Sequence, residues 1–228
     1  MLRMGPRRAL LYKRPAAAGG GAATGVSTDT SVDDAAASTD IDFASQAIGT
    51  PTATRLVVVG VGAYMSGGFG TISDVKVGGV SLTRVGGVGD ADYPVDMWAG
   101  NITTGTTATI RVTCTVAMSN VAIAVAALDN VNPTSTDLCG KVARGGEGTP
   151  YTTTTALTVP TDGLGVVACW VFNTSAADFT NLTKDLDTAG SATRMIIGLV
   201  TAAGDISPSV SNVNFAGIGL IAAAWAKA

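Results

Sequence analysis

Residues 107–115 read TATIRVTCT, and this stretch decides the fold class. Its apolar side chains recur at every second position, namely Ala108, Ile110, Val112 and Cys114. Threonines and Arg111 occupy the positions between them. Side chains of a β-strand point alternately to opposite faces, so this period of two predicts a half-exposed strand. From Ile41 onward, short apolar runs separated by clusters of Gly, Pro, Asn, Asp and Thr predict a succession of such strands.

A glycine pair predicts where two neighbouring strands turn. In residues 76–85 the apolar positions flank Gly78 and Gly79, and glycine readily adopts the positive φ that a tight hairpin requires. The segments KVGG and VSLTRV are therefore expected on adjacent antiparallel strands.

Five other runs are apolar on both faces: 56–61, 121–128, 164–172, 195–203 and 218–225. A two-sheet sandwich covers only one face of each strand, so the second face must be small, protected by loops, or packed on another subunit. Small residues fill many second-face positions, among them Ala122, Ala124, Ala126 and Gly165. Charged residues make up only 14% of the chain, which also favours cover by neighbours. We therefore hypothesise a homo-oligomeric assembly.

The predicted fold is an all-β, antiparallel two-sheet sandwich of the jelly-roll-like kind, with an extended N-terminal arm. No long window shows the 3.6-residue period of a helix with caps at both ends. The terminal LIAAAWAKA is interpreted as the last strand, because Gly217 and Gly219 disfavour a helix there. Residues 1–40 are expected to be a basic arm and a Gly/Ala-rich tether, and residues 41–228 a single domain.

The arm differs in charge from the remainder. Before residue 15 it carries no acid and five basic residues, Arg3, Arg7, Arg8, Lys13 and Arg14, while the rest of the chain sets nine basic residues against 17 acidic ones. Such an arm could dock on an acidic protein surface, and it is the only part expected to touch nucleic acid. Its apolar stretch is too short for a signal peptide, and no run is long enough to cross a bilayer, so no membrane role is expected.

The absence of histidine limits the chemistry. The 228 residues contain none, which removes Ser-His-Asp and Cys-His catalysis together with His-ligated metals. No glycine cluster forms a nucleotide-binding motif. Cys114, Cys139 and Cys169 have irregular spacing and are interpreted as small buried hydrophobes, although one disulfide remains open. We expect no catalytic residues, no metal and no cofactor.

One acidic cluster leaves an alternative open. Asp90, Asp92 and Asp96 crowd the segment DADYPVD, and close carboxylates could bind calcium or serve a hydrolase as an acid/base pair. Pro94 and the surrounding glycines favour the simpler interpretation, which is an exposed loop with solvated acids.

The aromatic residues fall into two groups. Trp170 and Trp225 sit in two-sided apolar runs and are expected in the core. Tyr64, Phe69 and Tyr93 lie in Gly-rich, loop-like surroundings and are the candidate contacts for a partner or a sugar.

The stretch ISDVKVGGVSLTRV, followed by VDMWAGNITTGTTATIRVTCT and VAIAVAALDNVNPT, resembles a β-sandwich module of tailed-bacteriophage virion proteins and some bacterial surface proteins. The resemblance spans roughly residues 41–228, and the N-terminal segment is similar to the arm-plus-linker beginnings of phage structural proteins. It implies architecture more than function, because such sandwiches decorate capsids, build tails or bind glycans. No active-site residue is carried over.

We therefore expect a non-enzymatic virion structural protein, assembled in the host cytoplasm. It would be a capsid-associated decoration or accessory subunit that contacts other virion proteins and is anchored through its arm. The alternative is a tail or fibre component that binds host-surface carbohydrate.

Overall fold

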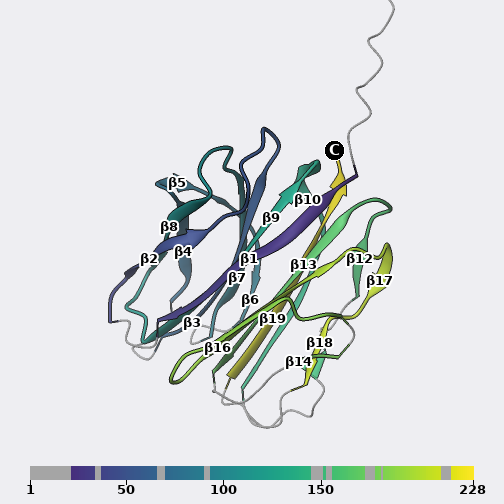
Figure 1. Cartoon of the computed structure of the whole chain (residues 1–228). Coiled ribbons are helices and arrows are strands. Elements are labelled where there is room, and N and C mark those ends of the chain that lie inside the picture. The colour runs from purple at the N-terminus through teal and green to yellow at the C-terminus, as the bar shows by residue number, and fades with distance from the viewer. Residues whose placement is uncertain are drawn as a thin grey trace, which may run out of the picture.

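The computed structural model describes residues 22–33, 37–65, 70–89, 93–144, 151–152, 156–172, 178–180, 182–211 and 217–228. Throughout these ranges the regular structure is β-strand, and every strand pair is antiparallel (Figure 1). The predicted all-β antiparallel sandwich is confirmed. No helix capable of spanning a membrane occurs in the described part of the chain.

Two five-stranded sheets form the body of the molecule. Sheet A has the order β1-β9-β3-β7-β6, with β1 (Thr24–Asp33), β9 (Asn120–Asp129), β3 (Leu56–Tyr64), β7 (Val95–Asn101) and β6 (Thr83–Val88). Sheet C has the order β10-β19-β13-β16-β15, with β10 (Val131–Arg144), β19 (Gly217–Lys227), β13 (Leu164–Phe172), β16 (Arg194–Val200) and β15 (Leu186–Ala189). Sheets A and C pack face to face.

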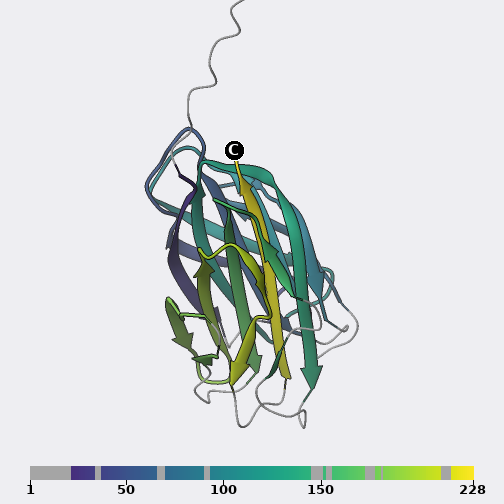
Figure 2. The ribbon, with the colours of Figure 1, turned by 90° about the vertical axis from the view of Figure 1, so that its right-hand side faces the viewer.

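Three smaller sheets add further layers. Sheet B has the order β2-β8-β4-β5, with β2 (Asp40–Ala47), β8 (Thr107–Cys114), β4 (Ile72–Val77) and β5 (Val80–Ser81). Sheet D joins β11 (Tyr151–Thr152), β18 (Ser209–Ser211) and β14 (Asp178–Phe179), and sheet E joins β12 (Leu157–Val159) and β17 (Gly204–Ile206). Figure 1 shows sheet B on one side of sheet A, and Figure 2 shows the small strands of sheets D and E in front of sheet C.

Three hydrophobic clusters separate these layers. The first lies between sheets B and A and includes Phe43, Val59 and Ile123. The second fills the space between sheets A and C, and the third lies between sheet C and the small sheets D and E. Sheet A is therefore a middle layer, with apolar side chains on both faces.

This layering explains the two-sided apolar runs. In β9 the branched Val121, Ile123 and Val125 belong to the first cluster, and the alternating small residues Ala122 and Ala124 belong to the second. The expectation that neighbouring subunits cover the second faces is wrong, because other sheets of the same chain cover them. The prediction of a homo-oligomer loses that support and stays a prediction.

Small residues are needed where sheets A and C meet. A Cβ added at Gly62 would lie 2.2 Å from Cγ of Trp170, and one at Gly60 would lie 2.6 Å from Cβ of Ala168. Real atoms do not approach so closely, so these glycines allow the two sheets to come together. Trp170 and Trp225 are fully buried, as predicted.

The local predictions for strands and turns are confirmed. In β8 the buried residues Ile110, Val112 and Cys114 alternate with less buried ones. Gly78 and Gly79 have φ of 57° and 85° and join β4 to β5, as a tight hairpin requires. All of the terminal LIAAAWAKA except Ala228 lies in the last strand, β19.

The sandwich begins earlier in the chain than residue 41. Residues 24–33 were expected to be tether, but they form β1, which pairs with β9 from Thr24↔Asp129 to Asp33↔Val121. Its composition contributes little to a core, yet an edge strand of sheet A needs only backbone pairing and partial burial. The domain boundary therefore falls before Thr24.

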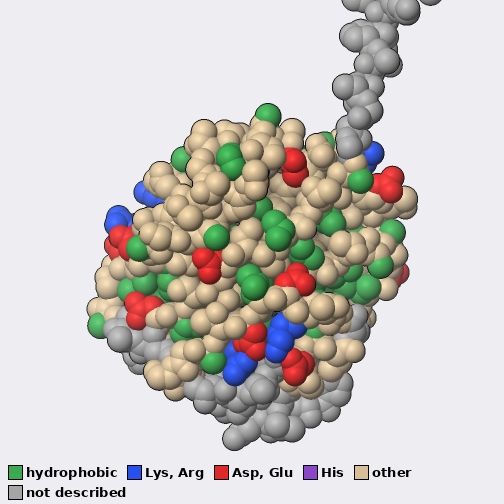
Figure 3. Space-filling view, in the orientation of Figure 1, with side chains coloured by type: hydrophobic (Ala, Val, Ile, Leu, Met, Phe, Trp, Pro, Cys, Tyr) green, Lys and Arg blue, Asp and Glu red, His purple; other side chains and the backbone are tan. Residues whose placement is uncertain are grey.

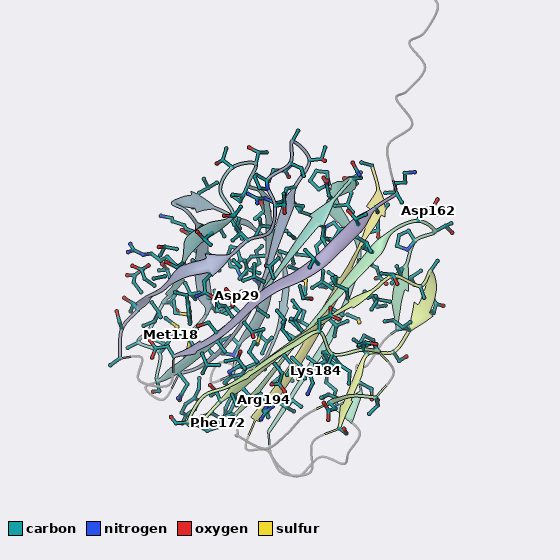
Figure 4. The ribbon with its side chains drawn as sticks, in the orientation of Figure 1. Asp29, Met118, Asp162, Phe172, Lys184 and Arg194 are labelled. Atoms are coloured by element: carbon teal, nitrogen blue, oxygen red, sulfur yellow. The ribbon has the colours of Figure 1, made fainter. Side chains whose placement is uncertain are left out.

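Strand register defines two ends of the molecule. At the first end, the carbonyl of Ala22 accepts a hydrogen bond from Nδ2 of Asn130 (3.4 Å), and the N–H of Ala228 donates to the carbonyl of Asn130 (2.9 Å). We call this the N/C end. The opposite end holds Tyr64, paired with Asn120, about 30 Å away at ~3.3 Å per strand residue. Asp162, which precedes β13, and Phe172, the last residue of β13, mark these two ends in Figure 4.

Candidate functional site

The candidate site is centred on an ion pair between Arg84 and Asp96. Nε of Arg84 donates to Oδ2 of Asp96 at 2.7 Å, and Nη2 donates to Oδ1 at 2.9 Å. The Asp96 side chain is 5% exposed and the Arg84 side chain is 52% exposed. A buried carboxylate is thus bound side-on by a guanidinium that also faces solvent.

An irregularity in the β6–β7 hairpin brings these two residues together. Arg84 is opposite Trp98, but Gly86 is already opposite Met97, so Val85 is an extra residue that forms a bulge. Arg84 and Asp96 then lie diagonally across the strand pair on one face. Hydrogen bonds from Nε and Nη2 of Arg84 outweigh burial and raise the pKa of its guanidinium.

Gly87 leaves the room that the pair occupies. A Cβ at this position would lie 1.8 Å from Oδ1 of Asp96 and 2.2 Å from Nη2 of Arg84. Both distances are far below any real contact, so the pair in this geometry requires glycine at position 87.

A crevice of about 540 Å³ opens beside the ion pair, between the end of β6 in sheet A and the start of β4 in sheet B. Its lining also includes the hydroxyl-bearing Thr71 and Thr115, three glycines and three apolar residues: Gly70, Gly87, Gly89, Ile72, Val88 and Pro94. The carbonyl of Pro94 accepts from the N–H of Ala63. The crevice therefore lies at the end of the molecule that is remote from the N/C end.

The polar groups of the crevice include both donors and acceptors. Oγ1 of Thr115 accepts from the N–H of Thr71 at 2.9 Å, which leaves its hydroxyl proton to donate elsewhere. Arg84 makes hydrogen bonds to Asp96 through two of its five N–H donors, and the other three have no partner among the described residues. The arrangement is suited to holding a polar ligand.

The structure changes the interpretation of the DADYPVD segment. The prediction of a solvated loop acid is wrong for Asp96, which is a buried residue of β7, because the Arg84 guanidinium compensates its charge. Asp90 and Asp92 lie outside the described residues. The hydrolase alternative stays a prediction, and Asp96 would enter it with both oxygens already bound by Arg84.

Two of the three predicted contact aromatics come together. The rings of Tyr64 and Tyr93 stack with centroids 5.2 Å apart, and Phe172 lies 4.7 Å from Tyr64. Tyr93 also contacts Trp170 at 5.9 Å. These half-buried rings pack on one another where sheets A and C meet, so their faces are used within the protein. Phe69 lies outside the described residues.

The predicted docking residues of the arm, Arg3, Arg7, Arg8, Lys13 and Arg14, also lie outside the described residues. Their role in docking stays a prediction. Ala22, which follows the arm in the sequence, lies at the N/C end.

The three cysteines are free and buried, as the interpretation as small hydrophobes predicted. Burial raises the pKa of the Cys114 thiol to about 12 and also raises that of Cys169. Across the described ranges, no group of three or more Cys, Asp or Glu side chains is placed to hold a metal ion.

A second charged cluster lies on the surface of sheet C. Asp187 contacts Nζ of Lys184 at 2.9 Å and Nη1 of Arg194 at 2.5 Å, and Asp178 also pairs with Lys184. Figure 3 shows Lys or Arg side chains beside Asp or Glu side chains in the lower part of this face, and Figure 4, in the same orientation, labels Lys184 and Arg194 there. Each charge is matched within the cluster, which fastens β14, β15 and β16 to one another.

Sequence reasoning missed Arg84 as the partner of Asp96. The available signal was that TRV and VDM each place one charge, of opposite sign, among apolar strand residues. In comparisons with known proteins, no protein-family model matches the chain, and no curated protein matches it.

Proposed function

We propose that this chain is a non-enzymatic structural protein of a phage virion, a capsid-associated accessory subunit anchored by its basic N-terminal segment. Its partners would be other virion proteins, and the sandwich would be the part displayed. The motif resemblance of residues 72–134 to virion sandwich modules supports this proposal.

The placement of the N/C end is the observation that carries the proposal. The described chain begins at Ala22, beside Asn130 and Ala228, and the basic residues precede it in the sequence, the last being Arg14. The crevice lies at the opposite end of the sheets. A subunit attached through residues 1–14 would therefore have its crevice end available on the side away from the attachment.

The self-covered core gives further support. Three clusters bury both faces of the central strands β3, β9, β13 and β19 within one chain, so these strands receive their hydrophobic cover from the chain itself. The basic residues of the arm, in contrast to the acidic domain, can then attract an acidic surface of a partner protein.

Deleting residues 1–14 tests the proposal. We expect the variant to keep the unfolding temperature of the full chain but to be lost from purified particles. A length-matched variant with Arg3, Arg7, Arg8, Lys13 and Arg14 changed to Gln separates charge from chain length, and it should be lost to the same degree. Unchanged incorporation of both variants would refute the anchoring role.

A further inference from the structure

We propose that the crevice beside Arg84 and Asp96 binds an uncharged, hydroxyl-rich ring of monosaccharide size. This inference does not rest on the virion role or on the arm. It also differs from the expectation that Tyr64, Phe69 and Tyr93 contact sugars, because Tyr64 and Tyr93 are not among the described residues that line the crevice, and Phe69 lies outside the described residues.

The size of the crevice suits a small ligand. Its volume of about 540 Å³ falls within the ~300–1,000 Å³ typical of small-molecule sites. Half-buried Val88, with the small exposed parts of Ile72 and Pro94, offers apolar surface to the C–H groups of a ring, and Thr71 and Thr115 belong to the same lining. A pyranose has this combination of apolar C–H groups and equatorial hydroxyls.

The charges select an uncharged ligand. Arg84 and Asp96 neutralise each other at 2.7 and 2.9 Å, so the site presents no net charge. An anion drawn to Arg84 would meet the Asp96 carboxylate directly behind it, and a cation drawn to Asp96 would meet the guanidinium. A neutral polyol avoids both repulsions.

The hydrogen-bonding groups match those of vicinal hydroxyls. Arg84 offers three N–H donors that have no partner among the described residues, and the carboxylate oxygens of Asp96 can each accept one more bond. A hydroxyl both donates and accepts, so adjacent hydroxyls can bridge a guanidinium and a carboxylate. An anion would use only the donors of Arg84, and a cation would use only the acceptors of Asp96.

The site is organised before any ligand binds. The side-on ion pair fixes the plane of the Arg84 guanidinium, and glycine at position 87 lets the pair lie against the β6 backbone. Fixed donors lose little conformational entropy on binding, which favours measurable affinity for a small neutral molecule.

The test is a titration of the ¹⁵N-labelled full chain with D-glucose, D-galactose, D-mannose and N-acetyl-D-glucosamine, followed by amide chemical shifts. At least one of these sugars should shift the amides of Thr71, Gly87, Gly89 and Thr115, with a Kd of about 1 mM. D-glucuronate and D-glucosamine serve as charged counterparts and should bind at least about tenfold more weakly than the best neutral sugar.

Two variants locate the binding. Thr115→Val removes a crevice hydroxyl and should weaken binding about fivefold, as loss of one hydrogen bond predicts. Thr113→Val is the matched control, because Thr113 lies two residues earlier and donates to Asp40 instead. Arg84→Lys keeps the charge, loses the outer donors and should weaken binding about tenfold.

Three results would overturn the proposal. The first is no shift with any neutral sugar, and the second is a shift confined to other parts of the domain. The third is tighter binding of a charged counterpart, which would contradict the selection argued from the neutral ion pair.

Discussion

Two arginines in different surroundings use their side chains differently. Arg55, towards the N/C end, is 1% exposed and donates to four backbone carbonyls, whereas Arg84 is half-exposed and, among the described residues, donates only to the carboxylate of Asp96. The number of N–H donors already used separates a structural arginine from one that can still bind a ligand.

The bonds of Arg55 join two loops. Nε donates to Ile102 at 2.5 Å, Nη1 donates to Gly49 and Gly105 at 2.6 and 2.8 Å, and Nη2 donates to Thr104 at 2.6 Å. All four acceptors are backbone carbonyls that would otherwise need another donor. Burial lowers the pKa of Arg55, and the four charge-assisted bonds compensate the loss of hydration.

Arg55→Lys should cause the greatest loss of stability, and Arg84→Lys is its counterpart. Arg55→Lys keeps the charge but cannot reach four carbonyls, so it should lower the free energy of unfolding by about 3 kcal/mol. Arg84→Lys can still pair with Asp96 and should cost less than about 1 kcal/mol. Urea denaturation of both variants measures the difference. Equal losses of unfolding free energy in the two variants would show that the two arginines do not differ in their structural role.

Substitutions at two glycines, Gly87 and Gly79, test whether the Arg84–Asp96 ion pair needs the space beside Gly87. Gly87→Ala places a methyl group on the ion pair and should cost about 2 kcal/mol by displacing the buried Asp96 from its partner. Gly79→Ala is the control, because nothing lies within 4 Å of its Cβ, and the only penalty is its φ of +85°. That penalty is about 1 kcal/mol. If the ion pair were unimportant, urea denaturation would rank the two variants in the reverse order.

A smaller loss of stability is expected from a change at Asp129, which lies near the loops joined by Arg55. Hydroxyl donors on Thr54 and Thr52, together with the N–H of Asn130, outweigh burial and lower the pKa of its carboxyl. A depressed pKa contributes stability that is present above the unfolded value, about pH 4, and is lost as pH falls through the folded value. Asp129→Asn should therefore cost about 1 kcal/mol at pH 7.

Unfolding measured from pH 7 to pH 2 checks this sign. The difference between the parent and Asp129→Asn should shrink as the carboxyl protonates in the folded state. Thr54→Val should show part of the same loss. A difference that grows as the pH falls would contradict the assignment.

Strands could be predicted from the sequence wherever one face differs from the other. The period of two in residues 107–115 and the pair Gly78–Gly79 are local signals, and both are confirmed. The runs that are apolar on both strand faces correctly indicated that both faces of these strands are buried. They could not indicate its source, because a sheet of the same chain and a second subunit impose the same apolar pattern.

The remaining features depend on contacts distant in sequence or on the backbone. β1 was missed because backbone pairing with β9 compensates for its polar composition. The partner of Asp96 depends on a bulge at Val85, which shifts the register by one residue. The acceptors of Arg55 are carbonyls, and a sequence carries no sign of where carbonyls point.

The buried cysteines make the layered core open to direct measurement. Cys114 lies between sheets B and A, whereas Cys139 and Cys169 lie under the small sheets that cover sheet C. A thiol reagent can modify each residue only when its own layer opens, so the rates of modification under native conditions report separate opening free energies. The molecule thus carries intrinsic probes that can reveal whether its layers unfold together or one after another.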